Sequence, residues 1–442
     1  MNRAENKPKL RFPEFQKEWE IKCIEEVSTK VNSGKTPLGG EKVYVKEGVF
    51  FIRSQNVNNN ELFLENVVFI PEDLNATMYN SIVKANDILL NITGASIGRS
   101  CVVPLEFSIG NVNQHVCIIR LDKKNNPRFL QPILASEKGQ NILFSLQAGG
   151  GREGLNFQNI RSFQCFFPSL PEQTKIASFF TAIDQKLTLL KKKKSLLEQY
   201  KKGVMQRIFC LNCDSYDYDD DNDFENHNSE SRQSYKSKKS QFRQLRFKDE
   251  NGNEFPEWGN KKLGEITFKF SRVNKDKHNY PVFSISNKYG FIPQNQQFED
   301  LDSEKRGYDI SLYKIVEKNV FAYNPARINV GSIGYSGSIN NVIISSLYVC
   351  FKTVNEINDY FLLYFFNTNH FKRSVLKKTE GGVRDYLFYD NFSSIKISTP
   401  HYSEQTKIAN FLTVIDDKIN LCQQQIEKTE LWKKGLMQKM FC

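Results

Sequence analysis

The sequence lacks the segments that membrane and exported proteins require. No stretch of its 442 residues approaches the roughly 20 uninterrupted apolar residues of a transmembrane helix. The first residues, MNRAENKPKLRF, do not contain the apolar core of a signal peptide. With 39% hydrophobic and 25% charged residues, the chain is nevertheless rich enough in apolar side chains to fold. These features exclude wholesale disorder and a membrane-embedded chain, and they predict a soluble, cytoplasmic protein of two to three domains.

Patterns that bind metal ions are also missing. Nine cysteines are scattered along the chain, and only Cys210 and Cys213 have the spacing of a zinc-ligand pair, with no second pair to complete the site. The acidic run that follows resembles a calcium loop starting at Asp217, but Asn222 stands where glycine is needed and Asn228 where glutamate is needed. The sequence therefore predicts reduced thiols and no metal site.

Catalytic motifs are absent in the same way. The tetrapeptide GKTP at 34–37 resembles part of a phosphate-binding loop, but Thr29 occupies the position of the required upstream glycine. The tetrapeptide NPAR at 324–327 begins like the Asn-Pro-Pro-aromatic loop of adenine methyltransferases and then departs from it. With only five histidines and no ordered nucleophile, base or metal group, we expect no catalytic activity in this chain.

The chain contains an internal repeat. Residues 172–210 align without a gap to residues 404–442, with 20 identities in 39 positions at an offset of 232 residues. The offset extends upstream to GGxR motifs at 149–152 and 381–384, and the openings of both globular regions contain the tripeptide LRF. A repeat of this kind determines the architecture. It predicts the order globular domain, helix, globular domain, helix.

Both repeated segments have the periodicity of long helices. Apolar residues recur at spacings of three, four and seven, which forms a stripe on one helical face. Lys194 and Lys201 interrupt the first stripe, and Pro171 stands at its first turn, where proline is tolerated. Two matching helices should pair along these stripes, which could also dock a partner. The stripe residues are Ile176, Phe180, Ile183, Leu187, Leu190, Leu197, Ile408, Leu412, Ile415, Ile419, Ile426 and Leu436.

The regions between the helices contain short β-branched and aromatic runs bounded by Asn, Gly and Pro, which are typical of strands. Each also has a helical stretch, near 127–147 and 357–378. The predicted fold class is α+β, with two globular domains separated by two long helices. The predicted boundaries are 1–171 for the first domain, 172–210 for the central helix, 211–244 for a low-complexity linker, 245–403 for the second domain and 404–442 for the C-terminal helix.

Basic residues are concentrated on the first helix. The chain has 61 basic and 50 acidic residues, but residues 172–210 alone have nine basic and three acidic ones. The four consecutive lysines at 191–194 could attract a DNA duplex or could form an ordinary solvated helix face, and the sequence favours neither.

These features together resemble a known family. The EQxKIAxFLTxID segments at 172–184 and 404–416, the KKGxMQxxF endings of both helices, the SGKTP near the start of the first domain and the GGxR motifs are similar to the specificity subunit of type I restriction-modification systems. The resemblance covers nearly the whole chain, and its two globular domains correspond to the family's target-recognition domains. The linker at 211–244 is longer and more acidic than the family pattern.

The resemblance implies a non-catalytic DNA-binding subunit. Each domain would read one half of an asymmetric bipartite target in double-stranded DNA, and the helices would form an antiparallel coiled coil that spaces the halves. The chain would hold two methyltransferase subunits and, through them, two motor-endonuclease (restriction) subunits. S-adenosylmethionine, ATP and magnesium would bind those partners, and none would bind this chain. The alternative is a stand-alone two-domain DNA-binding regulator or decoy without enzyme partners, and a protein-binding coiled-coil adaptor is more distant.

Candidate base-reading residues are polar side chains on turns beside predicted strands, because Arg, Asn and Gln discriminate bases in the major groove. An Asn in a turn often satisfies only its own backbone, which is the alternative for each. Arg152 and Arg384 occur in both copies, which favours a shared role such as gripping phosphate or bracing the helix junction. The candidates are Arg53, Gln55, Asn56, Asn91, Thr93, Ser96, Arg99, Asn113, Gln114 and Arg152 in the first domain, and Arg272, Asn324, Arg327, Ser332, Tyr335 and Arg384 in the second.

Overall fold

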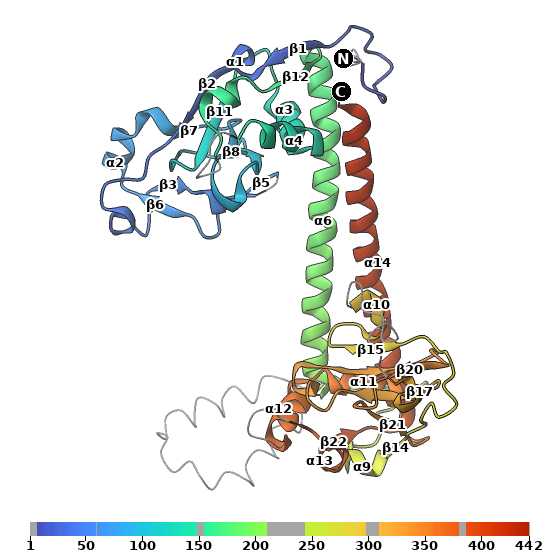
Figure 1. The fold of residues 1–442 in the computed structure, drawn as a ribbon. Helices are drawn as coiled ribbons and strands as arrows, with labels where there is room; N and C mark the ends of the chain where they lie inside the picture. Colours follow the sequence, from blue (N-terminus) through green and yellow to red (C-terminus); the bar gives the residue numbers. More distant parts are fainter. Residues whose placement is uncertain are drawn as a thin grey trace, which may run out of the picture. The chain divides into compact units, whose positions relative to one another are not determined.

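The computed structural model describes residues 7–58, 60–147, 154–209, 244–297, 309–379 and 386–441. The chain divides into two compact units (Figure 1). The first contains Met1–Lys193 and Cys422–Cys442, and the second contains Lys194–Leu421. Each unit therefore combines one globular domain with parts of both long helices.

The long helices are α6 (Leu170–Phe209, 40 residues) and α14 (Tyr402–Met440, 39 residues), drawn in green and red in Figure 1. Each begins two residues before the predicted start. The predicted apolar stripes are buried or partly buried along both helices, as at Ile176 and Ile408, which are 2% and 0% exposed. The two predicted long helices and their apolar faces are thus confirmed.

The helices run antiparallel. In the first unit, Lys433 of α14 forms an ion pair of 2.5 Å with Asp184 of α6. In the second unit, Lys201 of α6 forms one of 2.6 Å with Asp416 of α14. Within the first unit, Lys191 of α6 also pairs with Glu430 of α14 at 2.8 Å, so higher residue numbers on α6 meet lower residue numbers on α14. Asp184 and Asp416 are related by the 232-residue offset, as are Lys201 and Lys433, so the same ion pair is made twice. Lys201, which interrupts the apolar stripe of α6, therefore has a charged partner.

The first domain is an α+β domain built mainly from short strands. Its helices are α1 (Ile24–Val27), α2 (Glu72–Thr77), α3 (Pro127–Ala135), α4 (Glu137–Ser145) and α5 (Phe157–Arg161). Its strands are β1 (Glu20–Cys23), β2 (Ser28–Ser33), β3 (Val49–Ile52), β4 (Val57–Asn58), β5 (Glu61–Leu62), β6 (Val68–Ile70), β7 (Ile82–Val83), β8 (Ile88–Asn91), β9 (Ser100–Val102), β10 (Gly110–Val112), β11 (Val116–Leu121) and β12 (Gln164–Phe167).

Two four-stranded sheets organise this domain. One has the order β2-β11-β8-β9 and the other β6-β3-β10-β7, while β1-β12 and β4-β5 form two-stranded pairs. Strands β8 and β11 are buried over most of their length, which agrees with their continuous apolar sequences. Strand β10 runs parallel to β3, so the carboxyl ends of these two strands lie at the same edge.

The second domain repeats part of this plan. Its helices are α9 (Leu263–Ile266), α10 (Gln294–Gln297), α11 (Asp359–Phe366), α12 (Asn369–Lys378) and α13 (Tyr389–Ser393). Its strands are β13 (Gly259–Lys262), β14 (Thr267–Lys269), β15 (Phe283–Ser286), β16 (Gly290–Pro293), β17 (Lys314–Val316), β18 (Phe321–Tyr323), β19 (Ile333–Tyr335), β20 (Val342–Ile344), β21 (Val349–Thr353) and β22 (Lys396–Thr399). The sheet β14-β21-β18-β19 and the pair β13-β22 match β2-β11-β8-β9 and β1-β12 of the first domain.

Each predicted helical stretch contains two helices. Ser136 ends α3 and caps α4 by accepting a hydrogen bond from the N–H of Gly139 at 3.0 Å. Thr368 does the same between α11 and α12, accepting from the N–H of Phe371 at 3.2 Å. A side-chain oxygen at such a position satisfies a free helix N–H and favours a new helix start.

The end of each long helix packs against the domain of the other repeat. Phe441 at the end of α14 lies 5.8 Å from Phe129 of the first domain, ring centre to ring centre. Phe209 at the end of α6 lies 5.4 Å from Phe361 of the second domain. Phe209 and Phe441 are related by the 232-residue offset, and so are Phe129 and Phe361, so the two aromatic contacts are equivalent.

The start of each domain is tied to the helix that follows it by a buried carboxylate. Arg11 donates to both oxygens of Glu172, at 2.7 and 2.8 Å, and Arg246 donates to both oxygens of Glu404, at 2.9 and 3.0 Å. Glu172 and Glu404 are 1% and 0% exposed. Bidentate pairs of this kind fix geometry strongly.

No helix within the described residues is long and apolar enough to cross a membrane. Across the same residues, no group of three or more His, Cys, Asp or Glu is arranged to hold a metal ion. The Cys210–Cys213 pair, the rejected calcium loop and nearly all of the predicted linker lie outside the described residues.

Candidate nucleic-acid interface

In the first domain, three strand ends bring polar side chains together. Because β3 and β10 are parallel, the residues after Ile52 and after Val112 leave the sheet at the same edge. The N–H of Asn113 donates to the carbonyl of Ile52 at 3.1 Å, which fixes this register. Gln55 and Gln114, both predicted base readers, are exposed in the two loops that follow.

A chain of polar side chains joins these loops to the end of β8. Thr93 Oγ1 lies 2.6 Å from His115 Nδ1, and Gln114 Nε2 lies 3.1 Å from His115 Nε2. Thr36 Oγ1 donates to Gln114 Oε1. Thr93 and Gln114 were predicted from the sequence, whereas Thr36 and His115 were not. The network presents hydroxyl, amide and imidazole groups, which are suited to hydrogen bonding with base edges or phosphates.

Gly34 allows the segment at 33–37 to approach this network. A Cβ atom at Gly34 would lie 1.6 Å from the carbonyl oxygen of Val112, so only glycine fits there. The N–H of Gly34 donates to the carbonyl of Asn113 at 3.2 Å. The glycine that resembled part of a phosphate-binding loop therefore serves a close backbone contact that places Thr36 beside Gln114.

Arg53 follows β3 at the same edge and is partly buried. Its guanidinium carbon lies 5.8 Å from the ring centre of Tyr44, a cation–π contact. Among the described residues, its Nε is one of three buried side-chain polar atoms without a hydrogen-bond partner. A buried donor without a partner costs free energy. The Arg53 Nε–H is therefore a donor that a DNA acceptor could satisfy.

Three predicted asparagine readers of this domain lie in its interior. Asn56, Asn91 and Asn113 are 1%, 0% and 7% exposed. Asn56 donates to the carbonyl of Phe63 at 3.0 Å, and Asn91 donates to the carbonyl of Ser54 at 2.9 Å. The Asn113 side chain accepts from the N–H of His115. In this conformation they shape the loops rather than face outward.

The remaining described candidates of this domain differ in exposure. Arg99 is exposed, while Ser96 is partly buried and accepts a hydrogen bond from Asn91 at 3.1 Å. Arg152 and its repeat equivalent Arg384 lie outside the described residues.

In the second domain, the loop between β18 and β19 holds three candidates in different roles. Asn324 accepts from the N–H of Ala326 at 3.0 Å and so supports its own turn. Arg327 is exposed on that loop. Ser332 is 3% exposed and donates to the carbonyl of Ile285 at 2.9 Å. Arg327 is therefore the outward-facing member.

The other two candidates here have partners within the domain. The Tyr335 hydroxyl donates to Asp359 at 2.7 Å, and burial raises the pKa of Tyr335 above its usual value. Arg272 is exposed and donates to Glu317 at 2.8 Å, an ion pair that lowers the pKa of the Glu317 carboxyl.

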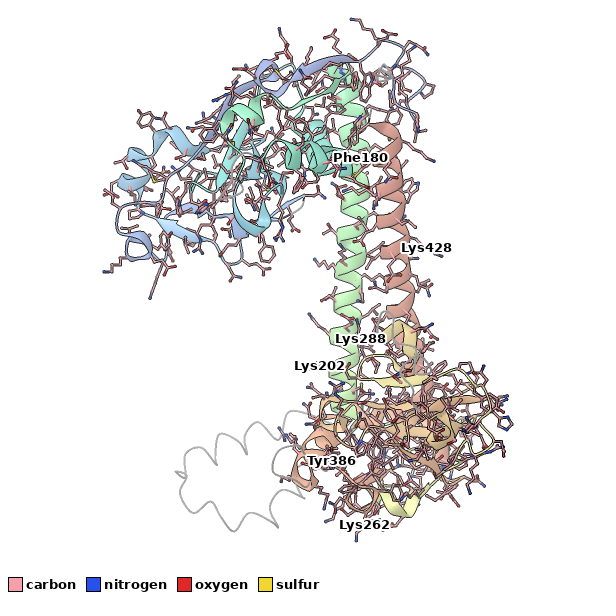
Figure 2. All side chains as sticks on the ribbon, viewed as in Figure 1. Phe180, Lys202, Lys262, Lys288, Tyr386 and Lys428 are labelled. Atoms are coloured by element: carbon pink, nitrogen blue, oxygen red, sulfur yellow. The ribbon has the colours of Figure 1, made fainter. Side chains whose placement is uncertain are left out.

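The β15–β16 hairpin adds residues that the sequence analysis missed. Its turn carries Lys288, labelled in Figure 2, and Tyr289, which is 67% exposed. The Lys288 Nζ lies 4.9 Å from the Tyr289 ring centre. Gly290 and Gly334 are in such close contact that a Cβ at Gly334 would lie 3.1 Å from the Gly290 Cα, which packs the hairpin turn against β19. In the sequence, this hairpin is indicated by Tyr289-Gly290 standing between two short apolar runs.

The lysine run on α6 is divided. Lys191 pairs with Glu430 of α14 at 2.8 Å within the first unit, and Lys194 pairs with Glu198 at 3.5 Å within the second. Lys192 and Lys193 are exposed. Two of the four lysines thus have acidic partners, and two are available to a polyanion.

Comparisons with known proteins agree on one family. The model of the type I restriction-modification DNA specificity domain matches residues 16–199 and again residues 256–431. A Methanocaldococcus jannaschii protein that carries the name MjaX specificity subunit of a type I restriction enzyme is 22% identical over 456 residues, covering 98% of this chain and 95% of that protein. The MjaVIII specificity subunit of the same organism is 26% identical over 204 residues, covering 45% of this chain and 47% of that protein.

The fold has a solved counterpart. The crystal structure of a type I restriction-modification S subunit from M. genitalium superposes with a TM-score of 0.58, at 13% identity, and covers 99% of both chains. At that identity the likeness concerns the fold. It supports the two repeated domains and two long helices described above.

Proposed function

The chain belongs to the type I restriction-modification DNA specificity family, and on that basis we propose that each domain reads one half of an asymmetric, two-part target in double-stranded DNA. The chain is the DNA specificity subunit of a type I restriction-modification system, with two recognition domains. The observation that carries the proposal is the contrast between equivalent helix attachments and different exposed loops. Two recognition surfaces that differ in chemistry fit two different sequences.

In the first domain the proposed reading surface comprises Arg53, Gln55 and Gln114, supported by Thr93 and His115. Glutamine can bind adenine and arginine can bind guanine with two hydrogen bonds each in the major groove. Arg53 and the two glutamines leave the sheet at one edge, so they can follow a single groove.

In the second domain the proposed reading surface comprises Arg327, Lys288 and Tyr289. The three residues lie on two adjacent loops, and all are exposed. Arginine and lysine can read guanine or grip phosphate, and the tyrosine can add an apolar contact. This surface is more basic than that of the first domain, which is consistent with a different half-site.

We propose that the chain is non-catalytic and binds no cofactor. S-adenosylmethionine, ATP and magnesium would be bound by its partners, which are two methyltransferase subunits and, through them, two restriction subunits. The helix pair would set the distance between the half-sites. The purified chain alone should neither methylate nor cleave DNA, and methyl transfer by the verified single chain would contradict this part of the proposal.

Domain exchange tests the central proposal. Residues 20–150 are replaced by the same region of a relative with a different target, and in a second chimera residues 260–380 are replaced. Each chimera is expressed with the cognate methyltransferase, and methylated positions are mapped by single-molecule sequencing. We expect the first exchange to alter one half-site and the second exchange to alter the other. A first-domain exchange that altered both half-sites would show that the domains do not read independently.

A further inference from the structure

We propose that helix α12 (Asn369–Lys378) binds the phosphate backbone of DNA through Lys372 and Arg373, and that the first domain has no equivalent contact. The inference rests on the proposed function, since it takes double-stranded DNA as the ligand. It goes beyond that function because it assigns a sequence-independent grip to one domain only. The two halves of the target would therefore be held by contacts of different kinds.

The charge of α12 differs from that of its counterpart in the first domain. Its ten residues, NHFKRSVLKK, include four basic and no acidic ones. The capping residues Ser136 and Thr368 align this helix with residues 137–146 of the first domain, EKGQNILFSL, at the offset of 232 residues. That segment contains one lysine and one glutamate. With histidine neutral, the two segments therefore differ by a net charge of four.

The charges of Lys372 and Arg373 are not used within the domain. Both side chains are exposed, and neither forms an ion pair with another residue that the structure describes. Other basic residues of this domain have acidic partners, such as Arg272 and Lys352, which both pair with Glu317. Because two adjacent positive charges repel each other, they become more favourable when an anion approaches.

The dipole of the helix explains only part of this charge. Lys377 and Lys378 lie in the last turn, where the negative end of the dipole favours cations. Lys372 and Arg373 lie in the first half of the helix, where the dipole gives a positive charge no advantage. Their presence there needs another reason, and a polyanionic ligand supplies one.

Helix α12 adjoins the loop that holds Arg327. Its buried residues Phe371 and Val375 share a core with Ile328, the residue directly after Arg327. The helix also lies against the short 3-10 turn η6 (Ile328–Val330) of the same loop. The basic side chains are therefore carried by a helix that packs directly against the proposed reading loop of the second domain.

The first domain shows how position 372 lies relative to such a loop. Gln140, its equivalent in α4, donates through Nε2 to the carbonyl of Gly98 at 3.0 Å. Gly98 belongs to the β8–β9 loop, and the matching sheet orders make this loop the counterpart of the β18–β19 loop with Arg327. A lysine at this position can therefore contact a phosphate beside the base that Arg327 is proposed to read, and such a contact carries no sequence information itself.

The test uses the full chain in complex with its cognate methyltransferase and two duplexes of equal length, one with the mapped target and one without it. The variant combines Lys372→Gln with Arg373→Gln, because glutamine is a good helix former. The loss of two phosphate contacts should make the slope of log affinity against log salt concentration less steep by about 1.8 on both duplexes. The preference for the target should stay unchanged. Ethylation interference should disappear at one or two phosphates beside the half-site that the second domain reads.

The matched control combines Lys261→Gln with Lys262→Gln, which removes the same charge from β13 of the same domain. Both residues are exposed, Lys262 is labelled in Figure 2, and the control should keep the slope. Circular dichroism verifies folding. A folded α12 variant with an unchanged slope would overturn the inference and leave the proposed function intact. So would an equal change in the control, which would show a general effect of net charge, or a loss of methyltransferase copies from the α12 variant in native mass spectrometry, which would assign the helix to a protein partner. An unchanged complex without any target preference would overturn the proposed function itself.

Discussion

The parts of the two domains that contact the helices are nearly the same, whereas their outer loops differ. Asn126 begins α3 and its N–H donates to Gln173 of α6 at 2.9 Å, and Asn358 begins α11 and its N–H donates to Gln405 of α14 at 2.9 Å. The loops show no such agreement. The first domain presents the Gln114–His115 network and the second presents the Lys288–Tyr289 turn.

This difference shows where the chain tolerates change. A helix attachment must fit a buried neighbour, so its residues are restricted in both repeats. A loop beyond the ends of the strands faces solvent or DNA and can vary without disturbing the core. The chain therefore combines a duplicated support with two independent recognition surfaces.

The largest expected effect comes from breaking the support. Replacing Ile183 and Leu187 with Asp places two charges in the buried stripe, each costing several kcal/mol. Because whole domains are stable by about 5–15 kcal/mol, we expect the first unit to lose its cooperative unfolding transition and the complex to fail to assemble. Urea denaturation and co-purification measure this. The control is Gln185→Asp, because Gln185 is exposed and Asp is the residue at the equivalent position 417. Normal methylation by the Ile183→Asp, Leu187→Asp variant would rule out the stripe as the pairing surface.

A smaller loss should follow from reversing one of the paired charges. Asp184→Lys places two lysines together in the first unit, and we expect a loss of about 1–2 kcal/mol, because the pair is partly exposed and lies between surface and buried ion pairs. Combining Asp184→Lys with Lys433→Asp should restore most of it. Thermal melting of the single and double variants measures the coupling. Equal losses in the single and double variants would show that the ion pair does not stabilise the helix pair.

Changing a single reading residue should affect only one half-site. Gln114→Ala should weaken discrimination at one base pair of one half by about 1–3 kcal/mol, and Arg327→Ala should do the same in the other half. Methylome sequencing of each variant with its methyltransferase measures the relaxed position. Arg272→Ala serves as the control because that arginine is already paired with Glu317. A uniform weakening across all sites would assign the tested residue to phosphate contact.

The smallest effect should come from making the two helices more alike. Lys192→Gln with Lys193→Gln introduces the residues found at 424 and 425, and we expect stability to change by less than about 0.5 kcal/mol. The slope of log affinity against log salt concentration for DNA should stay unchanged. A slope reduced by about 2 would instead show that both lysines contact phosphates.

Features that depend on local patterns could be predicted from the sequence. The long helices follow from their seven-residue spacing, and strands such as Val116–Leu121 follow from β-branched runs. The network of Thr36, Gln114 and His115 could not be predicted, because it depends on a parallel pairing of β3 with β10 across a long stretch of chain. For the same reason, the sequence cannot distinguish a buried asparagine such as Asn91 from an exposed reader.

The antiparallel arrangement was expected from the family resemblance, and its physical basis is visible only in the structure. A stripe of apolar residues specifies that helices pair but does not fix their direction. The pairs Asp184–Lys433 and Lys201–Asp416 do so, because only the antiparallel direction brings both sets of opposite charges together. The lysine at 201 interrupted the sequence pattern for this reason.

The first residues of the two domains occupy equivalent places. The N–H of Leu245 donates to the carbonyl of Arg207 at 3.1 Å, and the N–H of Leu10 donates to the carbonyl of Lys439 at 2.9 Å. In the second unit these two residues are joined by about 40 residues of chain, but in the first unit they belong to opposite ends of the sequence. The same geometry thus forms with and without a short covalent connection. A chain cut within residues 210–243 should therefore remain a single particle held by its paired helices.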